Sequence, residues 1–459
     1  MSVERICTNT FYKSEKGLCG VLFAGGIIVH ILYLFVLLRI APIDNWNWSH
    51  GDTATYISPA ESFLQTGVFA WHSVPEYRRT IGYPLFLSGA LKLGAITGVD
   101  WRMIVYVAQA IIFALIYPAI YYMGRDVFGL TRRVSIGCVG FTVFSGAFIS
   151  YTPIILSDAM FATALITGMV CGFYALGKRS ITWSLLHIVA ITYAATVRPM
   201  LAFYPFAAAC MHWAYIRSRY RPPDHFRCLL MAAMFLFTLI GVQTPAARNW
   251  VNHGVFTPSE NGFIIFYDYL ARDVLGMKKE LARYEQVQAV LAERSDHGMM
   301  GDRIAIRKRA ALRVYRDYPV ETAAFMLFYG MLNSLEMHWN NTLFYLFRQT
   351  WYRDYADGSV RWSPLPFVVG ILFVIVYGYI YSAAIFLAAT MRKNVWVITS
   401  VLVFLVPYAF CSTNYQGARM RLWFEPLLVL AAAMVFQEAY KVWLLCRESG
   451  PEDRQLRIP

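Results

Sequence analysis

Apolar runs of about twenty residues recur along the chain, separated by short polar segments. A helix needs about 20 apolar residues to cross a bilayer, whereas the strands of a membrane barrel alternate over about ten. The pattern therefore predicts an all-α fold: a polytopic transmembrane helical bundle with about ten spans and external interfacial helices. The predicted spans are residues 18–41, 101–123, 134–156, 159–177, 182–197, 200–216, 228–246, 364–390, 395–411 and 423–445.

Two longer regions interrupt this pattern within what we interpret as a single multi-pass membrane domain, residues 1–459. Residues 42–100 form a first external loop with interfacial helices, in which the apolar segment 82–94 is too short to cross. Residues 247–363 form a long external loop. Apolar residues at helical spacing among many charges predict amphipathic helices on the membrane surface there.

Basic residues in the short loops predict the orientation of the spans. They are Arg125, Arg132, Arg133, Lys178, Arg179, Arg217, Arg219, Arg221, Arg227, Arg392 and Lys393. With alternating crossings, all of them fall on the same side as both termini. Cytoplasmic loops carry an excess of Lys and Arg, so this side is predicted to be cytoplasmic and the first loop external.

Composition agrees with a membrane protein, because 58% of the 459 residues are hydrophobic and only 15% are charged. The formal charge of +13 would suggest a nucleic-acid partner in a soluble protein. Here most basic residues report topology and no nucleic-acid-binding motif occurs, so no nucleic acid is predicted. The eight cysteines are scattered without a CxxC motif. No metal site and no cofactor is therefore predicted, although a divalent cation is left open.

Several arginines lie on the external side at span ends, where topology does not favour positive charge. They are Arg78, Arg79, Arg198, Arg248, Arg419 and Arg421. Any single one could be snorkelling to ordinary lipid headgroups. As a group they predict a phosphate site, because the planar guanidinium donates two parallel hydrogen bonds to phosphate.

Two carboxylates fall on the same external side. Asp52 follows the first span, and Asp158 lies in the turn between spans 134–156 and 159–177. Either could simply cap the helix that follows it. At a lipid boundary, however, desolvation and nearby arginines act on a carboxylate in opposite directions. That balance makes Asp52 a candidate general base.

Short motifs surround these residues. They are Asp52-x-x-x-Tyr56, "RRTIGYPLFL" (78–87), "LSDAMF" (156–161), "PAARNW" (245–250) and "GARMRLWFEP" (417–426). Together they resemble motifs of GT-C glycosyltransferases, in particular the protein O-mannosyltransferases and lipid A aminoarabinose transferases, which use polyprenyl-phosphate sugars as donors. Ile81 stands where that family usually has proline, and no large domain is expected after the last predicted span.

The resemblance implies an inverting sugar transfer on the extracytoplasmic face. Asp52 would deprotonate an acceptor hydroxyl, and Asp158 would orient the acceptor or assist the base. Arg78 or Arg79, helped by Arg419 or Arg421, would stabilise the departing lipid phosphate. Tyr56 and Tyr83 would stack on the sugar, unless they are ordinary interfacial aromatics.

The expected partners are a polyprenyl-phosphate sugar donor, membrane lipids, and a glycan, lipid or protein acceptor. The expected location is a bacterial cytoplasmic (inner) membrane with the site facing the periplasm, and an endoplasmic reticulum membrane is the alternative. A transporter or flippase for a lipid-linked glycan, an O-antigen ligase or polymerase, and a subunit without chemistry are the competing functions. Few charges lie at the centres of the predicted spans, which disfavours a transporter.

Overall fold

Helices make up almost all of the described part of the protein, which confirms the all-α prediction. The computed structural model describes residues 3–40, 52–71, 74–75, 79–178, 180–199, 201, 225–293, 300–325, 375–376, 379–380, 382, 422 and 425–448. In these ranges the strands are β1 (Ala70–Trp71) and β2 (Val74–Pro75), which pair antiparallel as Ala70 opposite Pro75 and Trp71 opposite Val74.

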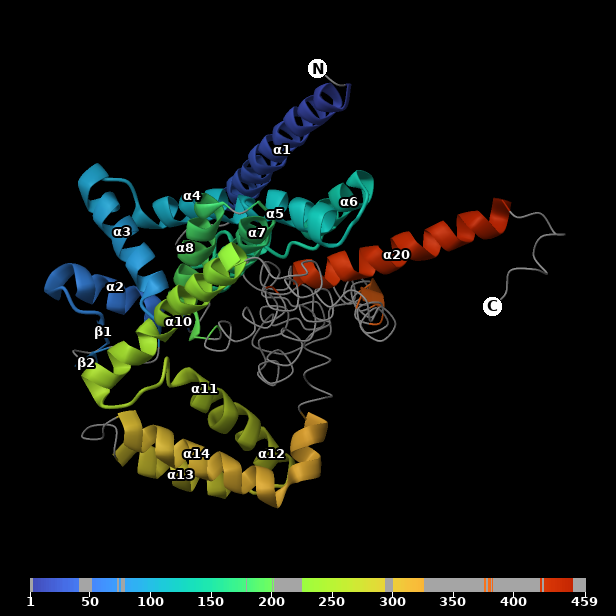
Figure 1. Cartoon of the computed structure of the whole chain (residues 1–459). Helices are drawn as coiled ribbons and strands as arrows, with labels where there is room; N and C mark the ends of the chain where they lie inside the picture. Colours follow the sequence, from blue (N-terminus) through green and yellow to red (C-terminus); the bar gives the residue numbers. More distant parts are fainter. Residues whose placement is uncertain are drawn as a thin grey trace.

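Figure 1 shows the helices of the described residues in chain order. Up to residue 253 they are α1 (Val3–Ile40), α2 (Ala54–Thr66), α3 (Gly82–Thr97), α4 (Trp101–Ala114), α5 (Ile116–Tyr122), the π-helix η2 (Met123–Val127), α6 (Arg132–Phe144), the 3-10 helix η3 (Ile149–Tyr151), α7 (Asp158–Lys178), α8 (Ile181–Val197) and α10 (His225–His253). Beyond it they are α11 (Asn261–Ile264), the π-helix η5 (Ile265–Ala271), α12 (Arg272–Met277), α13 (Leu281–Glu293), α14 (Met300–Asp317) and α20 (Glu425–Glu448).

Five helical stretches among these residues are long and apolar enough to cross a membrane. They are Gly17–Ile40, Trp101–Val127, Arg132–Tyr151, Asp158–Ala175 and Glu425–Leu444, which correspond to the predicted spans 18–41, 101–123, 134–156, 159–177 and 423–445. A shorter apolar helix, Thr182–Val197, matches the predicted span 182–197, and the predicted span 228–246 falls within α10. The predicted spans 200–216, 364–390 and 395–411 lie outside the described residues, apart from residue 201 of the first and a few positions of the second.

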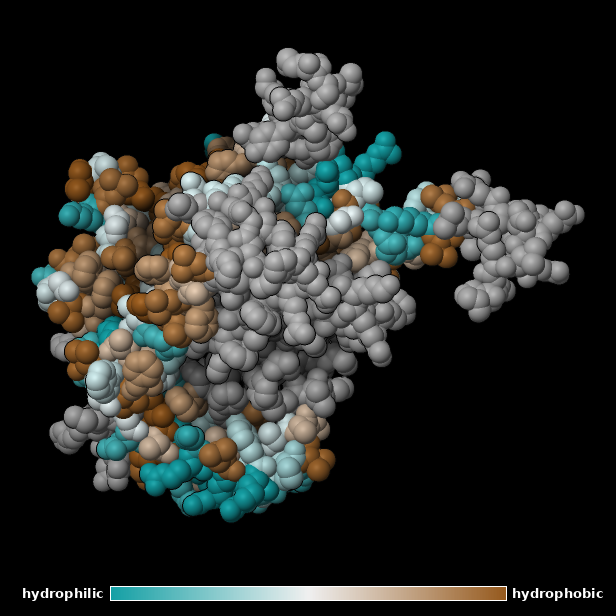
Figure 2. All heavy atoms as spheres, in the orientation of Figure 1, coloured by the Kyte–Doolittle hydropathy of each residue, from teal (hydrophilic) through white to brown (hydrophobic). Residues whose placement is uncertain are grey.

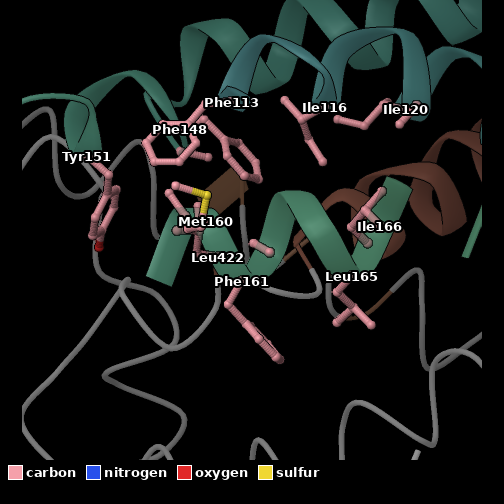
Figure 3. Close-up of a cluster of buried hydrophobic side chains, with 14 of the residues drawn as sticks. Phe113, Ile116, Ile120, Phe148, Tyr151, Met160, Phe161, Leu165, Ile166 and Leu422 are labelled. Carbon is pink, nitrogen blue, oxygen red and sulfur yellow. The ribbon is translucent and has the colours of Figure 1, made fainter. Parts of the chain in front are cut away.

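The bundle is built around α4, α5 and α7. Helix α1 packs on α4 and α5, α8 lies along α7, and α10 packs on α8 (Figure 1). At the centre, Phe113 of α4, Phe148 of the turn after α6 and Met160 of α7 are fully buried (Figure 3). Lipid is as apolar as these side chains, so close packing between helices rather than escape from water holds such a core together.

The outer faces of α1 and α10 carry exposed apolar side chains, as expected for surfaces that meet lipid. They include Val21, Ile28, Leu32 and Phe35 on α1, and Leu229, Leu236, Phe237 and Ile240 on α10. Apolar surface covers much of the described bundle in Figure 2, whereas hydrophilic surface gathers at the end occupied by α13 and α14. The apolar surface therefore marks the helices expected to face lipid, and the hydrophilic surface marks the layer that contains α13 and α14.

Helices α11 to α14 form this separate layer beyond the end of α10 (Figure 1). It has its own small core, in which Tyr267, Leu270 and Val274 pack against Ala311 and Val314 of α14. Helices thus lie where amphipathic helices are predicted, at α13 and α14, and apolar side chains of both join this core. Their position on a membrane surface, and the division of the chain into loops and one domain, stay predictions.

The start of α3 lies directly against the end of α8. A Cβ placed on Gly82 would come within 2.6 Å of Thr196 Oγ1 and 2.7 Å of the Thr196 carbonyl carbon. Next to it, Thr80 Oγ1 donates a hydrogen bond of 2.7 Å to the Val197 carbonyl. Only glycine allows this approach, and the approach fixes the residues just before α3 beside the end of α8.

Substitution of Gly82 by alanine is expected to lower stability by about 1–3 kcal/mol, because the backbone of Thr196 cannot move aside as a flexible side chain would. Gly89 of the same helix is the matched control, since it is exposed and its Cβ would meet nothing within 4 Å. Gly89→Ala is expected to be neutral or to stabilise by up to about 1 kcal/mol. The thermal unfolding midpoints of the two purified variants check this, and equal midpoints would contradict it.

Candidate active site

Segments that are far apart in the sequence meet at one end of the bundle. Thr53, in the segment that follows α1, donates to the carbonyl of Ile155, in the turn before α7, at 3.4 Å. From α10, Arg248 Nη1 donates to the Arg79 carbonyl at 3.2 Å. Together with the contact of α3 with the end of α8, these bonds gather the chain around residues 52–56, 79–83, 155–158, 197–198 and 248.

Asp52 and Arg79 form an ion pair in this region. The Arg79 Nη2 to Asp52 Oδ1 distance is 2.5 Å, and the side chains are 14% exposed for Arg79 and 27% for Asp52. Thr55 holds the pair from one side: its Oγ1 accepts from Arg79 Nε at 2.9 Å and donates to the Asp52 carbonyl at 2.6 Å. The carboxylate of Asp52 therefore keeps access to solvent while its orientation is set by a guanidinium.

Tyr56 contacts the same guanidinium through its ring and its hydroxyl. Arg79 Cζ lies 4.6 Å from the centre of the Tyr56 ring, and Arg79 Nη1 donates to the Tyr56 hydroxyl at 3.3 Å. The Tyr83 and Tyr56 rings meet in a T-shaped contact with their centroids 5.2 Å apart. Both tyrosines are buried. In the described residues both rings take part in an internal contact that supports Arg79. Their stacking on a sugar stays a prediction.

Asp158 and Arg198 form a second and more buried ion pair. Arg198 Nη2 lies 2.5 Å from Asp158 Oδ1, with side-chain exposures of 11% and 0%. Asp158 is the first residue of α7, where a carboxylate also meets the positive end of the helix dipole. Arg198 follows the last residue of α8, and its amide donates to the Ala194 carbonyl. The pair therefore joins the start of α7 to the end of α8.

Ser157 connects the two ion pairs. Its Oγ lies 2.7 Å from the Tyr56 hydroxyl and accepts from Arg198 Nε at 3.2 Å. A continuous chain of polar contacts thus runs from Asp52 through Arg79, Tyr56 and Ser157 to the second pair. The sequence analysis did not single out Ser157 or Thr55. The only feature of the sequence that pointed to these two residues was their position next to Asp158 and Tyr56.

Arg248 reaches the site from α10, three residues after Pro245. Its Nε and Nη2 donate to Asn249 Oδ1 at 2.9 and 2.6 Å. Asn249 is buried and donates in turn to the Thr257 carbonyl at 2.8 Å, which fixes the chain after α10. Asn249 was also not anticipated from the sequence.

The described part of the site carries three guanidinium groups (Arg79, Arg198, Arg248) and two carboxylates (Asp52, Asp158), so its formal charge is 3 − 2 = +1. Helices α3 and α7 also begin here, and the N-terminus of a helix attracts anions. This positive charge and the two helix N-termini suit an anionic ligand. The other predicted phosphate-binding residues, Arg78, Arg419 and Arg421, lie outside the described residues.

No group of three or more His, Cys, Asp or Glu side chains that could hold a metal ion occurs within the part of the chain that the structure describes. Asp158 is buried against Arg198, so Asp52 is the one carboxylate of the described site that reaches solvent. These residues on their own do not fit a divalent cation, which commonly takes several oxygen ligands.

A further set of buried charges lies in the layer formed by helices α11 to α14. Arg307 pairs with the fully buried Glu260, and its Nε lies 3.2 Å from Asp268 Oδ2. Arg303 Nε lies 3.6 Å from Glu260 Oε1, and Gln288 donates to Asp268 at 2.7 Å. Burial raises the pKa of Asp268 above its ordinary value although Arg307 opposes this. The two arginines balance the two carboxylates, and the set of four ties α14 to the chain around η5.

Comparison with known proteins adds evidence on the fold. No protein-family model and no curated protein sequence matches the chain. Among solved structures, it is similar to the crystal structure of the Archaeoglobus fulgidus oligosaccharyltransferase in the apo form, with a TM-score of 0.50 and 12% sequence identity. The likeness covers 94% of this chain and 51% of that one, so this protein spans about half the length of its structural neighbour. The chain thus shares the all-helical membrane fold of that structure, which agrees with the all-α fold that the sequence predicted.

Proposed function

We propose that the protein is a membrane glycosyltransferase that moves a sugar from a polyprenyl-phosphate donor to an acceptor hydroxyl on the extracytoplasmic face. The observation that carries this proposal is the meeting of Asp52, Arg79, Arg198 and Arg248 at one end of a bundle of the GT-C type. A solvent-accessible carboxylate beside several guanidinium groups provides both a base and a binding site for phosphate.

In the proposed reaction the Asp52 carboxylate takes the proton of the acceptor hydroxyl. The acceptor oxygen forms a bond to the anomeric carbon from the side opposite the phosphate, while the bond between that carbon and the phosphate oxygen breaks. The electron pair of the broken bond leaves with the lipid phosphate. The configuration at the anomeric carbon is therefore inverted.

Arg79 has two successive partners in this mechanism. While it is paired with Asp52, the guanidinium makes the carboxylate a weaker base. A donor phosphate that arrives beside Arg79 competes for the same guanidinium, and the carboxylate gains basicity as its partner is drawn away. Binding of the donor and activation of the base are then coupled, and the charge that develops on the leaving phosphate is stabilised by the same group.

The remaining residues fill supporting roles in this proposal. Because Asp158 is fully buried, we assign it to holding Arg198 in place rather than to contact with the acceptor. Tyr56 and Tyr83 support Arg79 from within the protein. Arg78, Arg419 and Arg421 remain proposed ligands of the donor phosphate.

The finer class follows from the sequence motifs alone. They favour a relative of the protein O-mannosyltransferases and lipid A aminoarabinose transferases, with a glycan, lipid or protein acceptor. The proposed location is the bacterial cytoplasmic membrane with the site on the periplasmic side. Incubation of the purified protein with a panel of labelled polyprenyl-phosphate sugars and these acceptor classes tests the function. Release of polyprenyl phosphate with labelling of an acceptor is expected, whereas movement of intact donor across vesicles without turnover would indicate a flippase.

Removal of the guanidinium groups is expected to weaken binding of the lipid phosphate. Arg79→Gln and Arg248→Gln each remove a charge-assisted contact, which is worth about 1.5–3 kcal/mol, or roughly a tenfold to hundredfold loss of affinity. Titration of polyprenyl phosphate into nanodisc-embedded protein measures this. Arg102→Gln is the control, because Arg102 lies on the start of α4 and pairs with Asp100 outside the site. Unchanged affinity in both site variants would return these arginines to the role of ordinary headgroup contacts.

A further inference from the structure

Gln109 is a fully buried polar side chain in the middle of α4, within a span. Its amide uses both ends. The Oε1 atom accepts a hydrogen bond of 2.7 Å from the Tyr83 hydroxyl, and Nε2 donates to the carbonyls of Thr152 at 2.8 Å and Ile154 at 3.2 Å. The side chain therefore ties two segments that are distant in the sequence.

Both of these segments carry residues of the candidate active site. Tyr83 lies in the first turn of α3, four residues after Arg79, and its ring meets Tyr56. Thr152 and Ile154 belong to the turn that leads into Ser157 and Asp158. Gln109 is thus a direct hydrogen-bonded bridge between the segment that carries Arg79 and the segment that carries Asp158.

His30 of α1 fastens the same turn from another direction. Its Nδ1 lies 2.5 Å from Thr152 Oγ1 and its Nε2 lies 3.1 Å from the Tyr117 hydroxyl. The imidazole is fully buried inside the first span. The turn at residue 152 is consequently held by polar side chains of two spans, α1 and α4.

An apolar side chain of similar volume would fill the place of Gln109 without any desolvation cost. In a water-poor interior, however, a backbone carbonyl such as that of Thr152 needs a donor, and Gln109 supplies it; the Ile154 carbonyl also accepts from the Leu156 amide at 2.9 Å. A fully satisfied amide selects one arrangement of the groups it joins. Burial also raises the pKa of Tyr83 well above its ordinary value, so its hydroxyl stays a donor to Oε1. The bridge is therefore directional and does not exchange with water.

We infer that Gln109 is a positioning residue: it sets the distance between the Asp52–Arg79 pair and the Asp158–Arg198 pair. This inference rests on the proposed function for its catalytic meaning. Its structural content stands on the three hydrogen bonds alone. A displacement of about 1 Å between reacting groups costs about a hundredfold in rate.

The first test is structural and needs no substrate. Gln109→Met keeps the volume and removes both ends of the bridge. Amide hydrogen exchange in peptides covering 79–87 and 152–161 of the full-length protein is expected to become about tenfold faster, as for loss of one buried hydrogen bond. Gln437→Met is the matched control, because Gln437 of α20 also bridges a distant segment, accepting from Thr131 N at 2.8 Å and donating to the Gly129 carbonyl at 3.4 Å.

Faster exchange of both peptides in Gln109→Met, with no change there in Gln437→Met, supports the inference. Unchanged exchange in Gln109→Met, or equal acceleration by the control, overturns it. Tyr83→Phe breaks only the α3 arm and keeps the buried amide, so it provides the same test should Gln109→Met fail to fold. In that variant the 79–87 peptide is expected to exchange faster, and unchanged exchange overturns the bridge.

The second test separates positioning from general stability. With a polyprenyl-phosphate sugar that the wild type turns over, Gln109→Met is expected to lower kcat about a hundredfold with little change in the donor KM. Tyr83→Phe should add little to Gln109→Met, because both remove the same bridge. A loss of kcat in Gln437→Met as large as in Gln109→Met contradicts positioning. If the wild type turns over no donor, the proposed function fails, while the exchange experiment still decides on the bridge.

Discussion

Replacement of Asp52 by asparagine is expected to lower the rate of sugar transfer by about 10²–10⁴-fold, the contribution of a positioned general base. Asparagine keeps the shape of the side chain and one oxygen that can accept from Arg79, but it cannot take up the proton of the acceptor. Donor binding should therefore persist. The measurement is single-turnover transfer by the purified variant, with titration of polyprenyl phosphate alongside.

Asp100→Asn is the matched control for this substitution. Asp100 is also a carboxylate at a helix start, where it pairs with Arg102 at 2.7 Å and accepts from the Arg102 amide as the N-cap of α4. Hydrogen bonds from Arg102 hold the pKa of Asp100 below its ordinary value. Asparagine is a good N-cap, so this variant should keep its fold and its activity. Full activity of Asp52→Asn would remove Asp52 from the role of base.

Disruption of the Asp158–Arg198 pair is expected to have the largest effect on stability. Asp158→Asn leaves a guanidinium that is almost completely buried without its anionic partner, and breaking a buried pair in this way costs about 3–5 kcal/mol. The thermal unfolding midpoint of the purified variant should therefore fall by many degrees. It is measured by size-exclusion chromatography after heating.

Two comparisons locate this effect in the buried pair. Glu438→Gln breaks the exposed pair of Glu438 with Lys441 on α20 and should cost only about 0–1 kcal/mol. The double variant Asp158→Asn with Arg198→Gln removes both charges, so its loss should be smaller than the sum of the two single losses. Additive losses would show that the two side chains act independently.

The sequence was sufficient for those spans that the described residues cover, and it indicated which residues share an end of the bundle. Runs such as residues 18–41 can satisfy their backbone in lipid only as helices, and alternate crossings bring Asp52, Asp158, Arg198 and Arg248 to the same side. The structure brings these four residues together through the Asp52–Arg79 pair and through contacts between α3, α7, α8 and α10.

The sequence could not predict which carboxylate pairs with which arginine, because the pairing depends on how the helices pack. Tyr83 illustrates the difference: an apolar segment too short to cross was expected at the interface, yet its tyrosine turns inward to Gln109. Gln109 itself carried a readable signal, since a lone polar residue within "YVAQAIIFAL" (106–115) is costly in a membrane. The direction of its hydrogen bonds could not be derived from that signal.

The Arg79 guanidinium is held at once by Asp52, Thr55 and Tyr56, and this affects how dissolved ions reach it. A free anion must displace a carboxylate that stays attached to the same chain and returns at once. An anionic group carried by a lipid tail is confined to the membrane surface, where its effective concentration is far higher. Under the proposed function, the resting ion pair thus disfavours soluble salts, and the membrane-anchored donor overcomes it through its high local concentration.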